Sequence, residues 1–189
     1  MHNTTMVNLM ETCATTREVE CWWHVTINMH GTWLPGDARG FRSSGHRIHS
    51  SGDYRHRPPP EEHRGLREHA RAIARQPVQL DSPQRALLGE AMLISLNRAD
   101  AHCIAAAISA THAHLLIKHK AQERSLKKLI TRIKQTTSYR VRDELPGKIW
   151  SKGSNRIQIR DRDHQLGVFQ YIVAHRTKEN AWVWTFDGR

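Results

Sequence analysis

Two histidines separated by a single residue are the first candidates for chemistry in this chain. His112 and His114 lie in residues 111–119, where apolar and polar positions alternate. On a β-strand, residues two apart point to the same face, with Cα atoms roughly 6.6 Å apart. Two imidazoles at that spacing can bind one metal ion at about 2.0–2.1 Å from each nitrogen. Because the chain has fourteen histidines, a chance pair is the alternative interpretation.

A tyrosine near the C-terminal end is the second candidate. Tyr171 and His175 stand four residues apart within residues 162–178, which we predict to be a helix, so the two side chains are neighbours. Tyr171 lies off the arc that we expect to face the core. That predicted core arc consists of Leu166, Phe169, Ile172 and Val173. The alternative interpretation is a half-buried tyrosine whose hydroxyl is in water.

The elements that must position these residues form an α+β pattern. Residues 21–29 alternate as a half-buried strand does, with Trp23, Val25, Ile27 and Met29 on one face and Trp22, His24, Thr26 and Asn28 on the other. The remaining predicted elements are a helix from Asp81-Ser82-Pro83 to about Arg98, adjacent antiparallel strands at 102–109 and 111–118, an amphipathic helix at 123–142, a strand-like stretch at 148–160, a helix at 162–178 capped by Asp161, and a strand or apolar plug at 181–186. This order predicts an antiparallel sheet flanked by helices.

Length and composition suggest one domain with an addition. The chain has 189 residues, which suits a single domain at 18–189 preceded by a flexible tail at 1–17. Residues 38–81 are rich in arginine, histidine, glycine, serine and proline, and a loop of that length does not belong inside a compact core. We therefore predict a basic insertion there, after the first strand, with a helix over 61–75.

The charge predicts a polyanionic partner. The formal net charge is +11, which indicates nucleic acid or an anionic membrane surface. No run approaches the roughly 18 apolar residues of a membrane span, and no secretory pattern opens the chain. Three scattered cysteines exclude a disulfide framework or a cysteine-based zinc site. We expect a cytoplasmic, nucleoid-associated protein without membrane contact.

The charge is concentrated in residues 118–160, which hold thirteen Lys and Arg against three acidic residues. A cluster of this kind is the footprint of a protein that binds phosphates. Trp150 stands among these cations and can serve as a stacking platform for a base; the alternative is a core tryptophan beside a solvated helix face. The candidate DNA-binding residues are Lys118, Arg124, Lys127, Lys128, Arg132, Lys134, Lys152 and Arg156.

Together these motifs resemble the single-tyrosine HUH transposases, which comprise the insertion-sequence 200/605-like and the repeated-extragenic-palindrome-associated (REP-associated) tyrosine transposases. The resemblance covers about 20–36 and 82–176, and it rests on order and spacing. The matching residues are the opening strand with the stretch 31–37, the histidine motif 111–117, the helix 126–142, Ile149-Trp150, the stretch 157–163, and Tyr171-Ile172-Val173-Ala174-His175.

The resemblance implies a ferredoxin/RRM-like HUH nuclease fold and a specific chemistry. It implies that Tyr171 cleaves single-stranded DNA, a hairpin or palindrome, by transesterification and forms a 5′-phosphotyrosine. His112, His114 and His175 would hold Mg²⁺ or Mn²⁺. The protein would act as a monomer or homodimer, and exchange of the tyrosine helix between subunits is one known arrangement in the family.

The sequence departs from the family at two positions and leaves two other functions open. Ala110-Thr111 precedes His112 where the family usually has Pro-Asp, and His175 replaces the Gln or Asn that often follows the tyrosine by four residues. Histidine is a competent ligand and can shift the preferred ion toward manganese or zinc.

Two alternative functions remain open: a catalytically inactive nucleic-acid-binding protein of the same fold and an unrelated histidine-metal hydrolase. The hydrolase needs a carboxylate base, and no Asp or Glu lies within eight residues of the histidine pair before Glu123.

Overall fold

The computed structural model describes residues 19–41, 50–51, 56, 58–59, 61–74 and 76–187. Its core is a five-stranded sheet in the order β4-β1-β3-β2-β5, and every pairing is antiparallel. The strands are β1 (Glu20–Asn28), β2 (His102–Ile108), β3 (His112–Lys120), β4 (Asn155–Gln158) and β5 (Trp182–Thr185). The helices are α1 (Arg64–Ile73), α2 (Ser82–Arg98), α3 (Glu123–Arg140) and α4 (Arg162–Lys178). The predicted α+β class, an antiparallel sheet flanked by helices, is confirmed.

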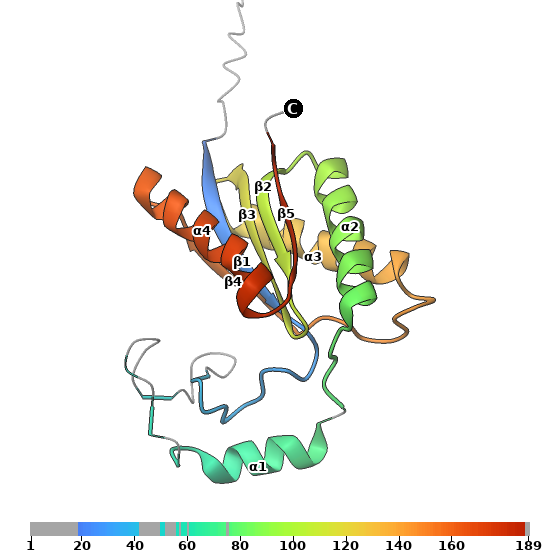
Figure 1. Cartoon of the computed structure of the whole chain (residues 1–189). Helices are drawn as coiled ribbons and strands as arrows, with labels where there is room; N and C mark the ends of the chain where they lie inside the picture. Colours follow the sequence, from blue (N-terminus) through green and yellow to red (C-terminus); the bar gives the residue numbers. More distant parts are fainter. Residues whose placement is uncertain are drawn as a thin grey trace, which may run out of the picture.

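The helices cover the two faces of the sheet unequally (Figure 1). α2 and α3 pack on one face, where the alternating apolar residues of β1 lie in the larger core cluster. α4 packs on the other face against a smaller cluster that includes Leu116 and Ile172. The sheet is therefore the middle layer, and the two faces of β3 contact different helices.

The termini of the helices follow the expected local chemistry. Asp81 forms a capping box with Gln84 at the start of α2, and Pro83 lies in the first turn. The carboxylate of Asp161 accepts a hydrogen bond from the backbone N–H of His164 and caps α4. The amphipathic prediction for α3 is correct, because its buried residues are Leu126, Leu129, Ile130, Ile133 and Thr137.

The predicted core face of α4 is wrong in part. Leu166 is about half exposed, at 48%. The buried residues of this helix are Gln165, Val168, Ile172 and His175. Two of these four are polar, and a pattern based on hydrophobicity does not identify a helix face that buries polar groups.

Trp150 belongs to the core and is not a stacking platform for a base. It is only 5% exposed and lies in the larger core cluster. Its indole N–H donates a hydrogen bond to the Thr137 hydroxyl at 3.1 Å, and its backbone bridges Met29 at the end of β1. The predicted strand-like stretch 148–160 contributes only the four residues of β4 to a regular ladder.

The helix predicted over 61–75 is present as α1, which lies beyond one end of the sheet (Figure 1). The predicted tail at 1–17 lies outside the described residues, as does much of 42–57. Among the described helices, none has the length and apolar character needed to cross a membrane.

The packing of β5 against α2 can be tested by substituting Gly89 on α2. A Cβ added to Gly89 would lie 2.3 Å from the Trp182 ring, so Gly89→Ala forces a shift in the core. We expect a loss of about 1–3 kcal/mol in the free energy of unfolding, measured by urea denaturation. Gly167 lies in an exposed part of α4, and a Cβ added there would meet nothing within 4 Å apart from adjacent residues and the backbone of its own helix. Gly167→Ala should therefore stabilise the protein by about 0.5–1 kcal/mol. Equal stability of the two variants would contradict the contact between Trp182 and α2.

Candidate metal and tyrosine site

The histidine pair lies on the sheet face that α4 covers. His112 and His114 point to the same face of β3, and their ring centroids are 4.8 Å apart. Ala113 between them is fully buried in the cluster on the opposite face. The alternation predicted for this strand is therefore correct.

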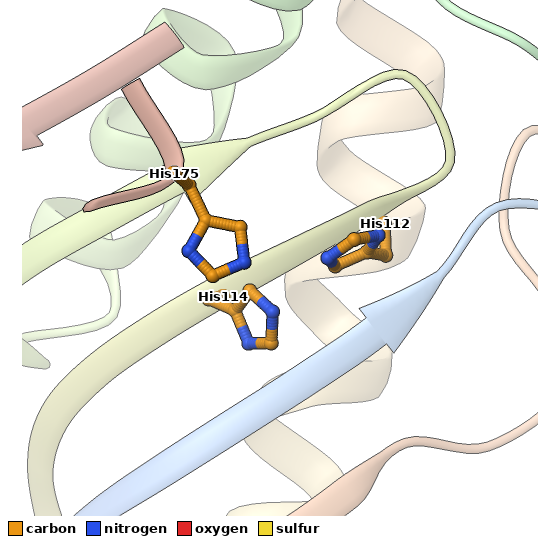
Figure 2. Close-up of side chains that lie close together, drawn as sticks. All are labelled: His112, His114 and His175. Carbon is orange, nitrogen blue, oxygen red and sulfur yellow. The ribbon is translucent and has the colours of Figure 1, made fainter. Parts of the chain in front are cut away.

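α4 brings a third imidazole to the pair. His175 is 4% exposed, and its ring centroid lies 4.6 Å from that of His114 and 5.7 Å from that of His112. One ring nitrogen from each of the three histidines lies within 4.8 Å of the other two. Figure 2 shows the three rings close together, with His112 and His114 on β3 and His175 on α4. Three imidazoles that converge in this way can hold one metal ion.

Hydrogen bonds at Nδ1 orient two of the rings. The Nδ1 of His175 donates to the Tyr171 carbonyl oxygen at 2.8 Å, so its Nε2 carries the lone pair. The Nδ1 of His112 lies 2.9 Å from the Ser109 hydroxyl. Since that hydroxyl donates to the His112 carbonyl oxygen, it can accept from Nδ1. Both rings thus present Nε2 to the site, as metal-binding histidines do.

The third ring is oriented by β1. The Nδ1 of His114 lies 3.1 Å from the Thr26 hydroxyl and 3.1 Å from the His24 Nε2. The Nε2 of His114 is buried and has no hydrogen-bond partner among the described residues. An unpaired buried nitrogen is costly unless something binds it. This atom therefore fits the ligand set of a metal ion, with the Nε2 atoms of the other two histidines beside it.

Glu179 is a site residue that the sequence prediction missed. Its carboxylate oxygens lie 3.7 Å from the Nε2 of His112 and 3.8 Å from the Nε2 of His175. It is the C-cap residue of α4, one turn beyond His175. Glu179 is remote in sequence from the histidine pair of β3, so spacing along the chain does not connect them. The interval of four residues from His175 is the one sequence signal that could have identified it.

Tyr171 lies next to the three histidines of its own chain. Its ring centroid is 4.6 Å from that of His175 and 5.2 Å from that of His114, and its side chain is 48% exposed. Burial, together with the negative charge of Glu179, raises the pKa of the Tyr171 hydroxyl. The phenol is therefore neutral at ordinary pH, and a cation near it would favour loss of its proton.

Burial favours the neutral form of three imidazoles at the site, those of His24, His112 and His114. Burial, with smaller contributions from the other site histidines, lowers the pKa of His114 to about 2. Burial also lowers the pKa of His24 to about 4, aided by His164 and His175. The pKa of His112 is lowered mainly by burial. Since only a neutral imidazole can bind a metal ion, burial of His112 and His114 favours the form in which they can act as ligands.

The predicted DNA-binding residues do not form one surface next to this site. α3 lies on the opposite face of the sheet, where its exposed side has a shallow groove. The residues that line this groove are Arg124, Lys127, Lys128, Thr131, Arg132 and Gln135. Lys118, on β3, pairs with Glu20 at 3.2 Å, and Lys152 is exposed in the loop before β4.

Two of the predicted DNA-binding residues have structural partners. The Lys134 ammonium donates to the carbonyl oxygens of Ser151 and Gly153, and burial lowers its pKa to about 8. The Arg156 guanidinium lies 2.9 Å from a carboxylate oxygen of Glu123. Both residues therefore stabilise the loop and strand that follow α3.

The lowered pKa values predict that the protein loses stability in mild acid. In the unfolded chain His24 has the ordinary pKa of about 6.5, so it binds a proton there that the folded state accepts only near pH 4. The free energy of unfolding is therefore highest above pH 6.5 and falls as the pH drops toward 4. Between pH 7 and pH 5 we expect His24 to account for a loss on the order of 1–2 kcal/mol, measured by urea denaturation with a chelator present.

The variant His24→Gln should flatten this pH dependence, because it removes one of the groups that binds a proton only on unfolding. His69, which is exposed on α1, offers the control, and His69→Gln should keep the wild-type dependence. An unchanged pH profile in His24→Gln would show that this imidazole is not buried as described.

Comparisons with known proteins support the fold. A solved structure of a REP-associated tyrosine transposase bound to a REP hairpin matches this chain with a TM-score of 0.50. The match covers 94% of this chain and 74% of the other at 13% sequence identity. No protein-family model and no curated protein sequence matches. The chain is therefore similar in fold to this tyrosine transposase, with an antiparallel sheet flanked by helices.

Proposed function

We propose that this protein cleaves and rejoins single-stranded DNA in a metal-dependent reaction, through a 5′-phosphotyrosine on Tyr171. The observation that carries the proposal is the convergence of one ring nitrogen from each of three histidines beside Tyr171, within one chain. The fold neighbour that binds a hairpin supports a hairpin or palindromic strand as the substrate class.

The ligands of the ion would be the Nε2 atoms of His112, His114 and His175, with Glu179 within reach of two of them. A bound Mg²⁺ or Mn²⁺ supplies charge neutralisation at the scissile phosphate and at the departing oxygen. A carboxylate beside the imidazoles adds a hard oxygen ligand, which suits these ions better than nitrogen donors alone.

Tyr171 would provide the nucleophile. Its hydroxyl oxygen attacks phosphorus, the bond from phosphorus to the 3′ oxygen breaks, and the released strand end takes up a proton to become a 3′ hydroxyl. The tyrosine proton passes to water, since the side chain is about half exposed. Attack of a 3′ hydroxyl on the phosphotyrosine reverses these bond changes, so rejoining requires no external energy source.

α4 holds Tyr171 and the candidate ligand His175 next to each other. The carbonyl of Tyr171 accepts the hydrogen bond that orients His175, so nucleophile and ligand are held by the same helical turn. The edge of the Tyr171 ring also contacts His24, at 5.8 Å between centroids. Attack in line with a phosphorus depends on positioning of this kind.

One observation favours a second candidate, the histidine-metal hydrolase. Glu179 supplies a carboxylate base, the group that the sequence around the histidine pair lacks. In that reaction a water molecule attacks the phosphate, and no covalent protein–DNA product forms. Trapping of an adduct distinguishes the two reactions.

The central prediction concerns this adduct. Labelled single-stranded hairpin DNA incubated with the protein and Mn²⁺ should become covalently attached, as seen by denaturing gel electrophoresis. Tyr171→Phe should abolish the adduct, because it removes the attacking oxygen and little else. Tyr139→Phe is the matched control: Tyr139 is 68% exposed on α3 and should not be needed.

Three outcomes have distinct meanings. An adduct that survives Tyr171→Phe contradicts the assignment of the nucleophile. Metal-dependent nicking without an adduct supports the hydrolase, and hairpin binding without cleavage supports the inactive nucleic-acid-binding protein. His112→Ala should abolish the adduct and retain hairpin binding, since the metal ligands and the cations of α3 lie on different faces of the sheet.

A second prediction concerns the groove on α3. Neutralising Lys128 and Arg132 with glutamine should reduce the salt dependence of DNA binding by a slope of about 0.7 for each phosphate that the protein no longer neutralises. The matched control removes two positive charges elsewhere, with Arg64→Gln and Arg98→Gln. An unchanged slope in the groove variant would mean that this face of α3 does not contact DNA.

A further inference from the structure

We propose that a pocket lined by arginines, next to His112, binds a nucleotide of the single strand that flanks the cleavage site. The pocket lies between the turn that follows β1, the helix α1 and the stretch that leads into α2, and its volume is about 540 Å³. This inference rests on the proposed function and extends it to the inserted segment. The residues that matter for it are Arg39, Arg67, Arg71, Gln76, Gln79 and Thr111.

The pocket is built by close contacts to the end of the sheet. Gly36 has a φ of +80°, and a Cβ there would lie 2.5 Å from the backbone nitrogen of Arg67, so the turn after β1 packs directly on α1. The backbone N–H of Val78 donates to the His30 carbonyl, and that of Leu80 donates to the Ala110 carbonyl. The stretch that leads into α2 is therefore hydrogen-bonded to the chain at the end of the sheet that holds His112.

The lining has the chemistry of a nucleotide site. Three guanidinium groups and one carboxylate, Asp37, line it, and Arg39 pairs with that carboxylate at 2.7 Å. Arg67 and Arg71 project from successive turns of one face of α1, a spacing suited to a phosphate between them. Gln76 and Gln79 add amide groups that can donate to and accept from base edges. The volume lies within the range of roughly 300–1,000 Å³ that ligand pockets occupy.

Because the pocket lies next to the candidate metal site, its position favours a nucleotide of the substrate strand as the occupant over an unrelated ligand. Thr111 lines the pocket and its hydroxyl lies 3.1 Å from the Nδ1 of His112, the next residue. A strand whose phosphate lies at the metal site would reach the pocket within its next few nucleotides.

The test compares two DNA probes without divalent ions, by fluorescence anisotropy. One probe is a hairpin with single-stranded extensions at both ends, and the other is the same hairpin with the extensions removed. Wild-type protein should bind the extended probe more tightly. Arg67→Gln combined with Arg71→Gln should weaken binding of the extended probe by about tenfold and leave the trimmed probe unchanged, because the variant cannot form two charge-assisted hydrogen bonds to the strand.

Two further variants keep the test decisive. Arg64→Gln is the matched control, because Arg64 lies on the same helix outside the pocket and pairs with Glu61 and Glu68. If the double variant folds poorly, Arg71→Gln can be tested alone, because Arg71 is exposed and its replacement should not disturb the fold. It should weaken binding of the extended probe only, by several-fold.

The remaining outcomes separate the pocket from the proposed function. If wild-type protein binds both probes equally and the arginine variants change nothing, the pocket proposal is wrong while DNA binding stands. If neither probe binds, the proposed function itself fails. Thymidine 5′-monophosphate is the third probe: if it binds with dependence on Arg67 and Arg71 while the extensions contribute nothing, the pocket is a site for free nucleotides and not for the strand.

Discussion

The pairing of β3 with β1 is the constraint on which the site depends. The register sets Thr26 opposite His114, and the Thr26 hydroxyl and the neighbouring His24 hold the Nδ1 of that histidine. Its Nε2 is then left buried and unpaired, at the point where two other imidazoles meet. A shift of one residue would turn both histidines of β3 into the apolar cluster under α2 and α3, and the three imidazoles could no longer converge.

The C-terminal helix supplies the other half of the site through its period. Tyr171, His175 and Glu179 follow one another at intervals of four residues, so they lie along one side of α4 and its C-cap. Apolar contacts of Val168 and Ile172 on the sheet fix the helix in place. The arrangement combines the buried imidazole of His175 with the half-exposed phenol of Tyr171. This combination suits the proposed reaction, which needs a metal ligand shielded from water and a nucleophile that a DNA strand can reach.

Much of this structure can be predicted from the sequence, because strand alternation and helix periodicity are local. The shared face of His112 and His114, the neighbouring pair Tyr171 and His175, and the α+β class all follow from such patterns. Alternation also assigns His24 and Thr26 to one face of their strand, but their contact with β3 depends on a register that a single sequence does not reveal. Glu179 escapes prediction for the same reason, since it approaches the histidines only through the packing of α4.

The basic residues show the limit of reasoning from charge alone. A run of cations predicts a polyanionic partner, but it does not distinguish Lys128 on an open groove from Lys134, which binds backbone carbonyls. Nor does it distinguish a base-stacking tryptophan from Trp150, whose indole is buried against Thr137. Those differences depend on burial, which is a property of the folded chain.

The most direct test of the central claim is the position of a bound ion. Crystals of the protein grown with Mn²⁺, measured at the manganese absorption edge, should show one anomalous peak within about 2.5 Å of the Nε2 atoms of His112, His114 and His175. A peak bound through the Nδ1 atoms, or manganese only at acidic groups remote from these histidines, would contradict the account.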